Sequence, residues 1–252
     1  MQGTSSDVET ATAFCTALVQ KAVADPRSMM NHPLVAAIAD GRATREQLLE
    51  YGTGMFRVVL DAQRWTAAGL VGCDDQDVRA RLLHSMVEEE TGSQSGTKSH
   101  AMLVADFLDA LGQPHDVTFA RARHLNPHFQ AWADLAEFLG RCRPYWLYRG
   151  TTSLAGEAQF TELCKLMVEV LPARYGVGTD DGLAFWSVHI PIDAEHTSSA
   201  VTVVAPFMTD PENRRQLETY VSLHMELRYR AWLEPLGTVG LPVVQPGRDG
   251  PA

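Results

Sequence analysis

The sequence has little positive charge and no long uninterrupted apolar run. Its 21 Lys and Arg residues are outnumbered by 31 Asp and Glu residues, which gives a formal net charge of −10. Nucleic-acid binders and polybasic membrane-surface proteins need clustered Lys and Arg to neutralise phosphate, so this balance argues against both classes. Arg, Asp or Glu interrupts every hydrophobic run before it reaches the roughly 18 to 20 residues that cross a bilayer. We therefore expect a soluble protein whose partner is a small molecule.

Cysteine pairs and targeting signals are also missing. The chain has four scattered cysteines and no CxxC pair: Cys15, Cys73, Cys142 and Cys164. This pattern predicts buried, reduced thiols rather than a disulfide framework. Residues 1–10 contain no Lys or Arg ahead of an apolar segment, so they do not resemble a signal peptide. A cytoplasmic location follows from this reading.

What the sequence does have is helical periodicity. Apolar residues recur at three- and four-residue steps after Thr44, and Gln47 completes a capping-box pattern. Asp210 and Pro211 have the residue types typical of an N-cap and a first helical position. Seven helical segments are predicted, over residues 44–73, 75–90, 101–111, 127–139, 145–171, 181–209 and 211–236. With no credible strand pattern, we expect a single all-α domain, a seven-helix-type bundle over 1–236, and an irregular or disordered tail over 237–252.

The sharpest motif is a set of ligand-type residues near the end of the chain. His189, Asp193 and His196 are four and three positions apart, so on a helix they share one face. Two imidazoles and a carboxylate suit iron or manganese, whereas structural zinc usually recruits thiolates. The surroundings are apolar, and burying such a face without a metal is costly. A solvated helix face or satisfied core hydrogen bonds would give the same spacing, and Pro191 predicts a bend or a helix start inside the motif.

A second set of ligand-type residues lies earlier in the chain. Glu88, Glu89 and Glu90 end a predicted helix, and the small polar segment 91–99 allows His100 to return to the same centre. We assign Glu90 as the ligand, but three adjacent acids cannot all face one way, so Glu88, Glu89 and a purely solvated surface remain alternatives. Glu157 lies among small residues that leave space beside it. Carboxylates and imidazoles that project inward from separate helices build the di-iron sites of helical bundles.

These motifs resemble those of a known family, the heme-oxygenase-like di-iron oxidases and oxygenases, which share their fold with the TenA and PqqC proteins. The resemblance covers most of the chain and includes residues 31–33, 41–47, 90–92 and 106–112. Its most specific parts are six positions of matching residue type: Glu90, His100, Glu157, His189, Asp193 and His196.

The resemblance implies that these six residues hold two iron ions, with Glu157 as the bridging carboxylate, and that the protein activates dioxygen. It also implies N-oxygenation or oxidative fragmentation of a small amine, amino acid or related metabolite, a type of chemistry common in natural-product biosynthesis. An external electron donor and a homodimer fit this picture. Asp61 is a candidate for an extra ligand that would favour N-oxygenation, and its alternative role is an ion pair with a neighbouring Arg.

The resemblance leaves the substrate pocket and several rival functions open. Four side chains are pocket candidates, with ordinary packing as the alternative: Arg64, Tyr145, Tyr148 and Arg149. A cofactor-free PqqC-like oxidase is one rival. A TenA-like hydrolase would need Cys142 or Cys164 as a nucleophile, and a heme oxygenase would need an axial histidine such as His32. A non-catalytic helical binding protein that keeps a metal for stability is the rival of another class.

Overall fold

The computed structural model describes residues 5–237, and for Ser5, Ser6 and residues 194–196 it describes the backbone alone. This part of the chain contains eleven α-helices and no strand: α1 (Ser5–Ala24), α2 (Pro33–Ala39), α3 (Arg45–Val71), α4 (Gln76–Thr91), α5 (His100–Ala110), α6 (His115–Arg121), α7 (Pro127–Cys142), α8 (Tyr145–Thr152), α9 (Ala158–Val170), α10 (Asp180–Val204) and α11 (Pro211–Gly237). The predicted all-α class is confirmed. Of the predicted tail, Gly237 ends α11, and residues 238–252 lie outside the described residues.

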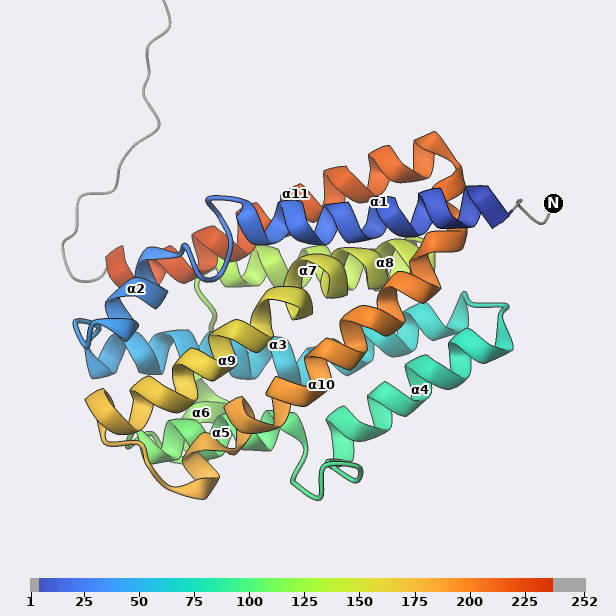
Figure 1. Ribbon diagram of the computed structural model, residues 1–252. Coiled ribbons are helices and arrows are strands. Elements are labelled where there is room, and N and C mark those ends of the chain that lie inside the picture. The colour runs from blue at the N-terminus through green and yellow to red at the C-terminus, as the bar shows by residue number, and fades with distance from the viewer. Residues whose placement is uncertain (1–4, 238–252) are drawn as a thin grey trace, which may run out of the picture.

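The long helices cross one another in a bundle (Figure 1). α10 packs against α9 and α5, while α3 and α11 both pack against α7. α4 lies at the margin of the bundle and contacts α3, α5 and α10. The end of α4 is thereby brought to the start of α5 and the middle of α10, which are the segments that carry the predicted ligands.

Local hydrogen bonds explain where several helices begin. The Gln47 backbone N–H donates to the Thr44 side chain over 3.2 Å, and the Thr44 N–H donates to the Gln47 side chain over 2.7 Å, so the predicted capping box is confirmed. Asn126 caps α7 by accepting the Phe129 N–H over 2.8 Å. Replacing such a cap by alanine costs roughly 0.5–2 kcal/mol.

The apolar interior consists of two clusters. One includes Phe56, Phe107 and Trp186, and the other includes Leu147 and Leu154. Complete burial of one such side chain contributes about 1.5–3 kcal/mol. Residues of both clusters line the internal cavity described below, so the cavity lies where the two clusters meet.

The structure corrects the predicted helices in several places. α1, α2 and α6 lie in segments for which no helix was predicted, and a π-helical turn divides the predicted helix 145–171 into α8 and α9. α6 is held in place because the Gln113 amide donates to the buried Thr118 side chain over 3.0 Å and to Thr53 of α3 over 3.0 Å. α10 runs without a break through Pro191, so no helix starts there. Proline removes a single N–H from a helix whose other backbone bonds remain.

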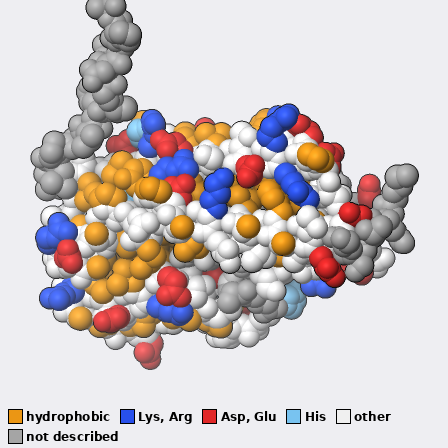
Figure 2. Space-filling view, turned by 45° about the horizontal axis from the view of Figure 1, so that its top comes forward, with side chains coloured by type: hydrophobic (Ala, Val, Ile, Leu, Met, Phe, Trp, Pro, Cys, Tyr) orange, Lys and Arg blue, Asp and Glu red, His pale blue; other side chains and the backbone are white. Residues whose placement is uncertain are grey.

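The cysteines and the surface bear on the remaining expectations. Cys15, Cys73 and Cys164 are buried free thiols, as predicted, but Cys142 is exposed at the end of α7. Lys and Arg side chains on the face in Figure 2 lie beside Asp and Glu side chains rather than in one basic area. Within residues 5–237, no helix has the length and apolar content needed to span a membrane.

Candidate metal centre

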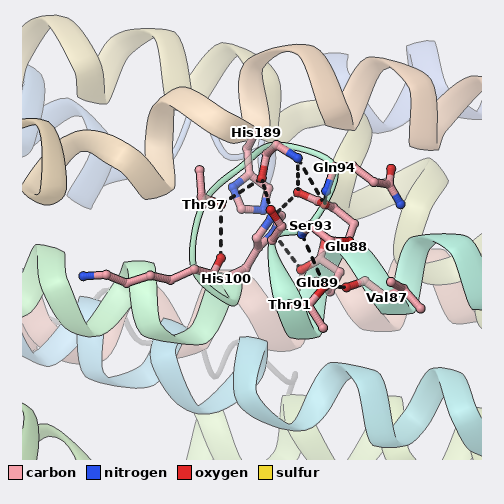
Figure 3. Close-up of polar contacts among 12 residues, drawn as sticks. Val87, Glu88, Glu89, Thr91, Ser93, Gln94, Thr97, His100 and His189 are labelled. Atoms are coloured by element: carbon pink, nitrogen blue, oxygen red, sulfur yellow. Dashed lines mark hydrogen bonds and ion pairs between the residues drawn. The ribbon is translucent and has the colours of Figure 1, made fainter.

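Three ligand-type side chains meet where α4, α5 and α10 come together (Figure 3). One ligand atom each from Glu89, His100 and His189 lie within 4.8 Å of one another. Nδ1 of His100 lies 2.8 Å from Oε2 of Glu89, and the two imidazole ring centroids are 4.6 Å apart. His100 is fully buried and His189 is 6% exposed, so this cluster lies inside the protein.

The hydrogen bond made by His189 determines which ring nitrogen faces the cluster. Its Nδ1 lies 2.7 Å from the Phe185 carbonyl oxygen, which can only accept, so Nδ1 carries the proton. Nε2 is then the unprotonated nitrogen with a lone pair available to a metal. The rings of Phe160 and Phe185 pack on His189 with centroid distances of 5.4 and 4.5 Å and restrict its orientation.

The contact between His100 and Glu89 is close but poorly aligned. The 2.8 Å separation lacks the geometry of a hydrogen bond, and Nδ1 of His100 has no hydrogen-bond partner within the described structure. Burial alone lowers the pKa of His100, but the carboxylates of Glu89 and Glu88 outweigh burial and raise that pKa above its usual value. An imidazole nitrogen and a carboxylate oxygen at this separation suit a shared metal ion, which would take the place of the imidazole proton.

Glu88 connects this cluster to the turn between α4 and α5. Its carboxylate accepts the backbone N–H groups of Gln94 over 2.7 Å and Ser95 over 3.3 Å, and it lies 3.4 Å from Nε2 of His100. Burial raises the pKa of Glu88, but these hydrogen bonds outweigh burial and hold the pKa below its usual value. Gly92 permits the turn with a φ of 62°, because a Cβ there would lie 2.4 Å from the Lys98 carbonyl oxygen. Glu88 therefore fixes the turn that places His100.

Two further carboxylates approach the same region. Glu157 ends a single π-helical turn, η1 (Ser153–Glu157), and Arg149 donates to its Oε1 over 3.2 Å. π-Helical turns inside α-helices are frequent at functional sites. Asp193 is 2% exposed; burial first, and then the negative charges of Glu157 and Glu89, raise its pKa well above the usual value. These three carboxylates repel one another inside the protein, and a bound cation relieves that repulsion.

An internal cavity of about 170 Å³ adjoins these groups. Glu89, Glu157, His189 and Asp193 line part of its wall, and we call this part the acidic end. Most of the remaining wall is apolar, and it includes Trp132 and His224, which we call the histidine end. A separate, more polar pocket between α4 and α10 shares Ser85 and Arg149 with this cavity.

The donor set fits a hard or borderline metal ion such as iron. It combines imidazole nitrogens with carboxylate oxygens, as non-heme iron sites do, and it includes no thiolate. The fixed tautomer of His189 and the poorly aligned His100 contact agree with this fit.

The structure separates the predicted ligands into three groups. His100, His189, Asp193 and Glu157 all lie at or beside the acidic end, as described above. Glu90 does not lie there, because its side chain is exposed on α4. Glu89, the residue before it, is the one that lies beside His100 and His189. The side chain of His196 lies outside the described residues, and its backbone belongs to α10.

Asp61 is buried, but it does not line the cavity. Its carboxylate pairs with Arg57 one turn earlier and with Arg64 over 3.4 Å. This is the ion-pair alternative that the sequence left open for Asp61. The contacts described for Asp61 therefore give no support to an extra metal ligand at this position.

Two of the four candidate pocket residues line the cavity, and two do not. Tyr148 and Arg149 line the cavity, and the Tyr148 hydroxyl lies 3.1 Å from the Thr66 hydroxyl. Arg64 is 73% exposed, and Tyr145 packs on Phe207 with ring centroids 5.6 Å apart. Neither Arg64 nor Tyr145 lines the cavity; Tyr145 shows the packing alternative, whereas Arg64 is an exposed partner of Asp61.

Sequence reasoning missed Trp132 and His224. His224 belongs to a buried stripe of α11 with Leu217, Val221, Met225 and Arg228 at helical spacing. A histidine within an apolar stripe was the available signal, but the same pattern is produced by an ordinary core histidine.

Two rival functions can be compared with the geometry. Burial raises the pKa of Cys164 well above the usual value, which opposes the thiolate that a hydrolase nucleophile needs, and exposed Cys142 does not line the cavity. For His32, Nδ1 accepts the Leu34 N–H over 3.0 Å and Nε2 lies 3.0 Å from the Tyr229 carbonyl oxygen. Both nitrogens of His32 are engaged by backbone groups, which opposes an axial role.

Comparison with known proteins adds an independent finding. Residues 49–231 match the family described as iron-containing redox enzyme. A 4-aminobenzoate synthase from Nitrosomonas europaea is 27% identical over 201 residues, covering 76% of this chain and 78% of that protein.

Solved structures are similar over nearly the whole chain. A CADD-like protein of unknown function from Nostoc punctiforme has a TM-score of 0.73 at 21% identity, with 91% of this chain and 98% of the other covered. A TenA homologue from Pseudomonas syringae has a TM-score of 0.72 at 15% identity, with 92% of each chain covered. These likenesses confirm the expected TenA-type, heme-oxygenase-like fold.

Proposed function

The chain belongs to the family of iron-containing redox enzymes, and we propose that it is a dioxygen-activating, non-heme di-iron oxygenase or oxidase. Its substrate is a small amine, amino acid or related metabolite, oxidised by N-oxygenation or by oxidative fragmentation in a natural-product pathway. The observation that carries this proposal is the convergence of Glu89, His100 and His189 beside a largely apolar cavity.

Six residues would hold the two irons: Glu89, His100, Glu157, His189, Asp193 and His196. When bound, iron supplies the electrons and the open coordination positions that dioxygen chemistry requires, and an external donor restores the electrons. The chain's own groups set the conditions. The Phe185 carbonyl keeps the His189 proton on Nδ1, and Arg149 holds one oxygen of Glu157. The largely apolar wall offers few partners to water beside the reacting groups.

The cavity supports a compact substrate. Its volume of about 170 Å³ compares with the roughly 150 Å³ cavity that holds benzene in an engineered protein. A single ring or a chain of similar volume therefore fits. The relative from Nitrosomonas europaea is a 4-aminobenzoate synthase, and a single-ring cavity makes the formation of an amino-substituted aromatic acid the second candidate function.

The test is anaerobic titration of the full chain with ferrous iron, followed by measurement of oxygen uptake. We expect about two irons per chain and iron-dependent oxygen consumption. His189→Ala should abolish both while the far-UV circular dichroism stays unchanged, and His124→Ala, at an exposed position, is the matched control.

Three results would contradict the proposal. Failure of the folded wild-type protein to take up iron would favour a cofactor-free oxidase of the same fold. Iron uptake that raises the melting temperature without any oxygen consumption, with amines and amino acids present, would favour a metal-stabilised binding protein. Full turnover by the His189→Ala variant would show that His189 is not a metal ligand and that the metal centre is assigned to the wrong residues.

A further inference from the structure

His224 presents one nitrogen to the cavity and keeps the other engaged. Nε1 of Trp132 lies 3.2 Å from Nδ1 of His224. The indole N–H can only donate, so Nδ1 is the acceptor and the imidazole proton is on Nε2. His224 is 4% exposed, and its ring is held edge-on to the Trp132 ring with centroids 5.5 Å apart. The ring is therefore fixed in both tautomer and orientation.

Nε2 of His224 has no hydrogen-bond partner within the described residues. It borders the cavity beside Gly156, where an added Cβ would lie 3.6 Å away. Burial, reinforced by the positive charge of Arg228, lowers the pKa of His224 to about 3. The group that faces the cavity is thus a neutral N–H donor, and leaving a buried donor unsatisfied costs free energy.

This arrangement is not a general property of buried histidines in the chain. His32 is also almost fully buried, yet both of its nitrogens have backbone partners. The cationic Arg228 lies close enough to lower the pKa of His224, and it is held by the Ala155 carbonyl over 3.0 Å and the Gln159 side chain over 3.1 Å. Its charge makes the histidine end favourable for an acceptor that carries negative charge.

The acidic end differs from the histidine end in the charge of its side chains. The acidic end contains the carboxyl groups of Glu89, Glu157 and Asp193 and one cation, Arg149, which donates to Glu157. Acidic groups outnumber basic ones there, so this end favours an amine or a metal over an anion. A ligand with a negatively charged oxygen and a separate oxidisable group is therefore oriented by the difference between these two sets of side chains.

We propose that His224 is a substrate-binding residue whose Nε2–H donates to the carboxylate oxygen of a compact, single-ring acid. The ring occupies the apolar middle of the cavity, and an oxidisable substituent such as an amine faces the acidic end. Trp132 is a positioning residue that keeps the proton on Nε2. This inference rests on the proposed function for the presence of a small substrate, and it adds the substrate class and the direction in which that substrate lies.

The experiment measures ligand preference by isothermal titration calorimetry with two probes, 4-aminobenzoate and aniline, which differ in the carboxylate. The full chain is used both metal-free and loaded anaerobically with ferrous iron. For wild type we expect 4-aminobenzoate to bind about 10-fold more tightly than aniline, as one hydrogen bond to a charged acceptor predicts. His224→Leu should lose this preference, and His224→Gln, which supplies an amide N–H, should retain part of it.

The ratio of the two affinities distinguishes loss of carboxylate recognition from a general distortion of the cavity, because a distorted cavity weakens the binding of both probes. Circular dichroism and iron stoichiometry are the controls for the fold and for the metal centre. The inference is overturned by a wild-type protein that binds neither probe or shows no preference, and equally by a His224→Leu variant that keeps the 10-fold ratio. Failure of the proposed function shows instead as missing iron or oxygen uptake, and the metal-free titration tests His224 independently of that result.

Discussion

The acidic end and the histidine end of one cavity satisfy their polar groups in different ways. At the acidic end, His100 faces Glu89 over 2.8 Å without hydrogen-bond alignment, and burial together with the neighbouring carboxylates raises the pKa of Asp193. At the histidine end, Trp132 and His224 form an ordinary hydrogen bond of 3.2 Å, and a single N–H faces inward. A cation would satisfy the acidic end, whereas a hydrogen-bond acceptor would satisfy the histidine end.

This difference assigns separate tasks to the two walls. Groups at the acidic end gain from a metal because their lone pairs and charges point at one another. The N–H of His224 cannot ligate a metal while it carries its proton, so it can only orient a ligand. Substitutions at the acidic end should therefore change metal affinity, and substitutions at the histidine end should change ligand preference.

The largest expected effect belongs to Glu89. Replacing it with Gln keeps the shape but removes the charge and one ligand oxygen next to His100. Loss of a residue that only supports a ligand typically costs 10–100-fold in metal affinity, so loss of a ligand should weaken ferrous iron binding by about 100-fold or more. Anaerobic iron titration measures this directly.

Glu90→Gln is the matched control, because it changes the adjacent residue by the same chemistry at an exposed position. We expect iron affinity within about 2-fold of wild type for this variant, since exposed charges contribute little. A large loss with Glu90→Gln and none with Glu89→Gln would reverse the assignment and restore Glu90 as the ligand.

The choice between Glu89 and Glu90 shows where prediction from sequence ends. Thr44 with Gln47 and Asp210 with Pro211 predicted helix starts correctly, because capping depends on residues close in sequence. Which of three adjacent acids faces inward depends on how α4 is rotated about its axis, and that rotation is set by contacts with α3, α5 and α10. No local pattern records those contacts.

Three other features of the structure could not be predicted, because they too depend on contacts that no local sequence pattern records. The π-helical turn that carries Glu157 has no residue signature in the sequence, and α6 is stabilised by the bond from Gln113 to Thr118 in a segment that reads as loop. The pairing of His224 with Trp132 joins residues 92 positions apart. The ligand residue types on α10 were predictable because helical spacing alone places His189 and Asp193 on one face.

An intermediate effect is expected from Glu88. Glu88→Gln keeps an oxygen that can accept from Gln94 or Ser95, but it removes the charge that strengthens both hydrogen bonds and attracts His100. The turn should loosen, and iron affinity should fall by about 10-fold, as for other residues that orient a ligand. Hydrogen exchange at the Gln94 and Ser95 amides should accelerate in the same variant, which separates this cause from direct loss of a ligand.

The result for Glu88→Gln would be inconsistent with this role if iron affinity fell while the two amides stayed protected. Glu88 would then act as a ligand itself, and the acidic end would extend further toward the α4–α5 turn. Unchanged affinity together with faster exchange would confine Glu88 to holding the turn, without influence on His100.

The smallest expected effect tests the histidine end through Trp132. Trp132→Phe preserves an aromatic ring but removes the N–H that engages Nδ1 of His224. The imidazole proton can then reside on either nitrogen, so Nε2 donates only part of the time. One neutral hydrogen bond contributes about 0.5–1.5 kcal/mol, so the preference for 4-aminobenzoate over aniline should fall by about 2- to 10-fold.

Iron affinity is the control for the Trp132→Phe variant. It should stay at the wild-type value, because Trp132 is not among the metal ligands. A loss of iron binding with an unchanged probe ratio would show that the two ends do not act separately, since a change confined to the His224 tautomer cannot reach the metal ligands.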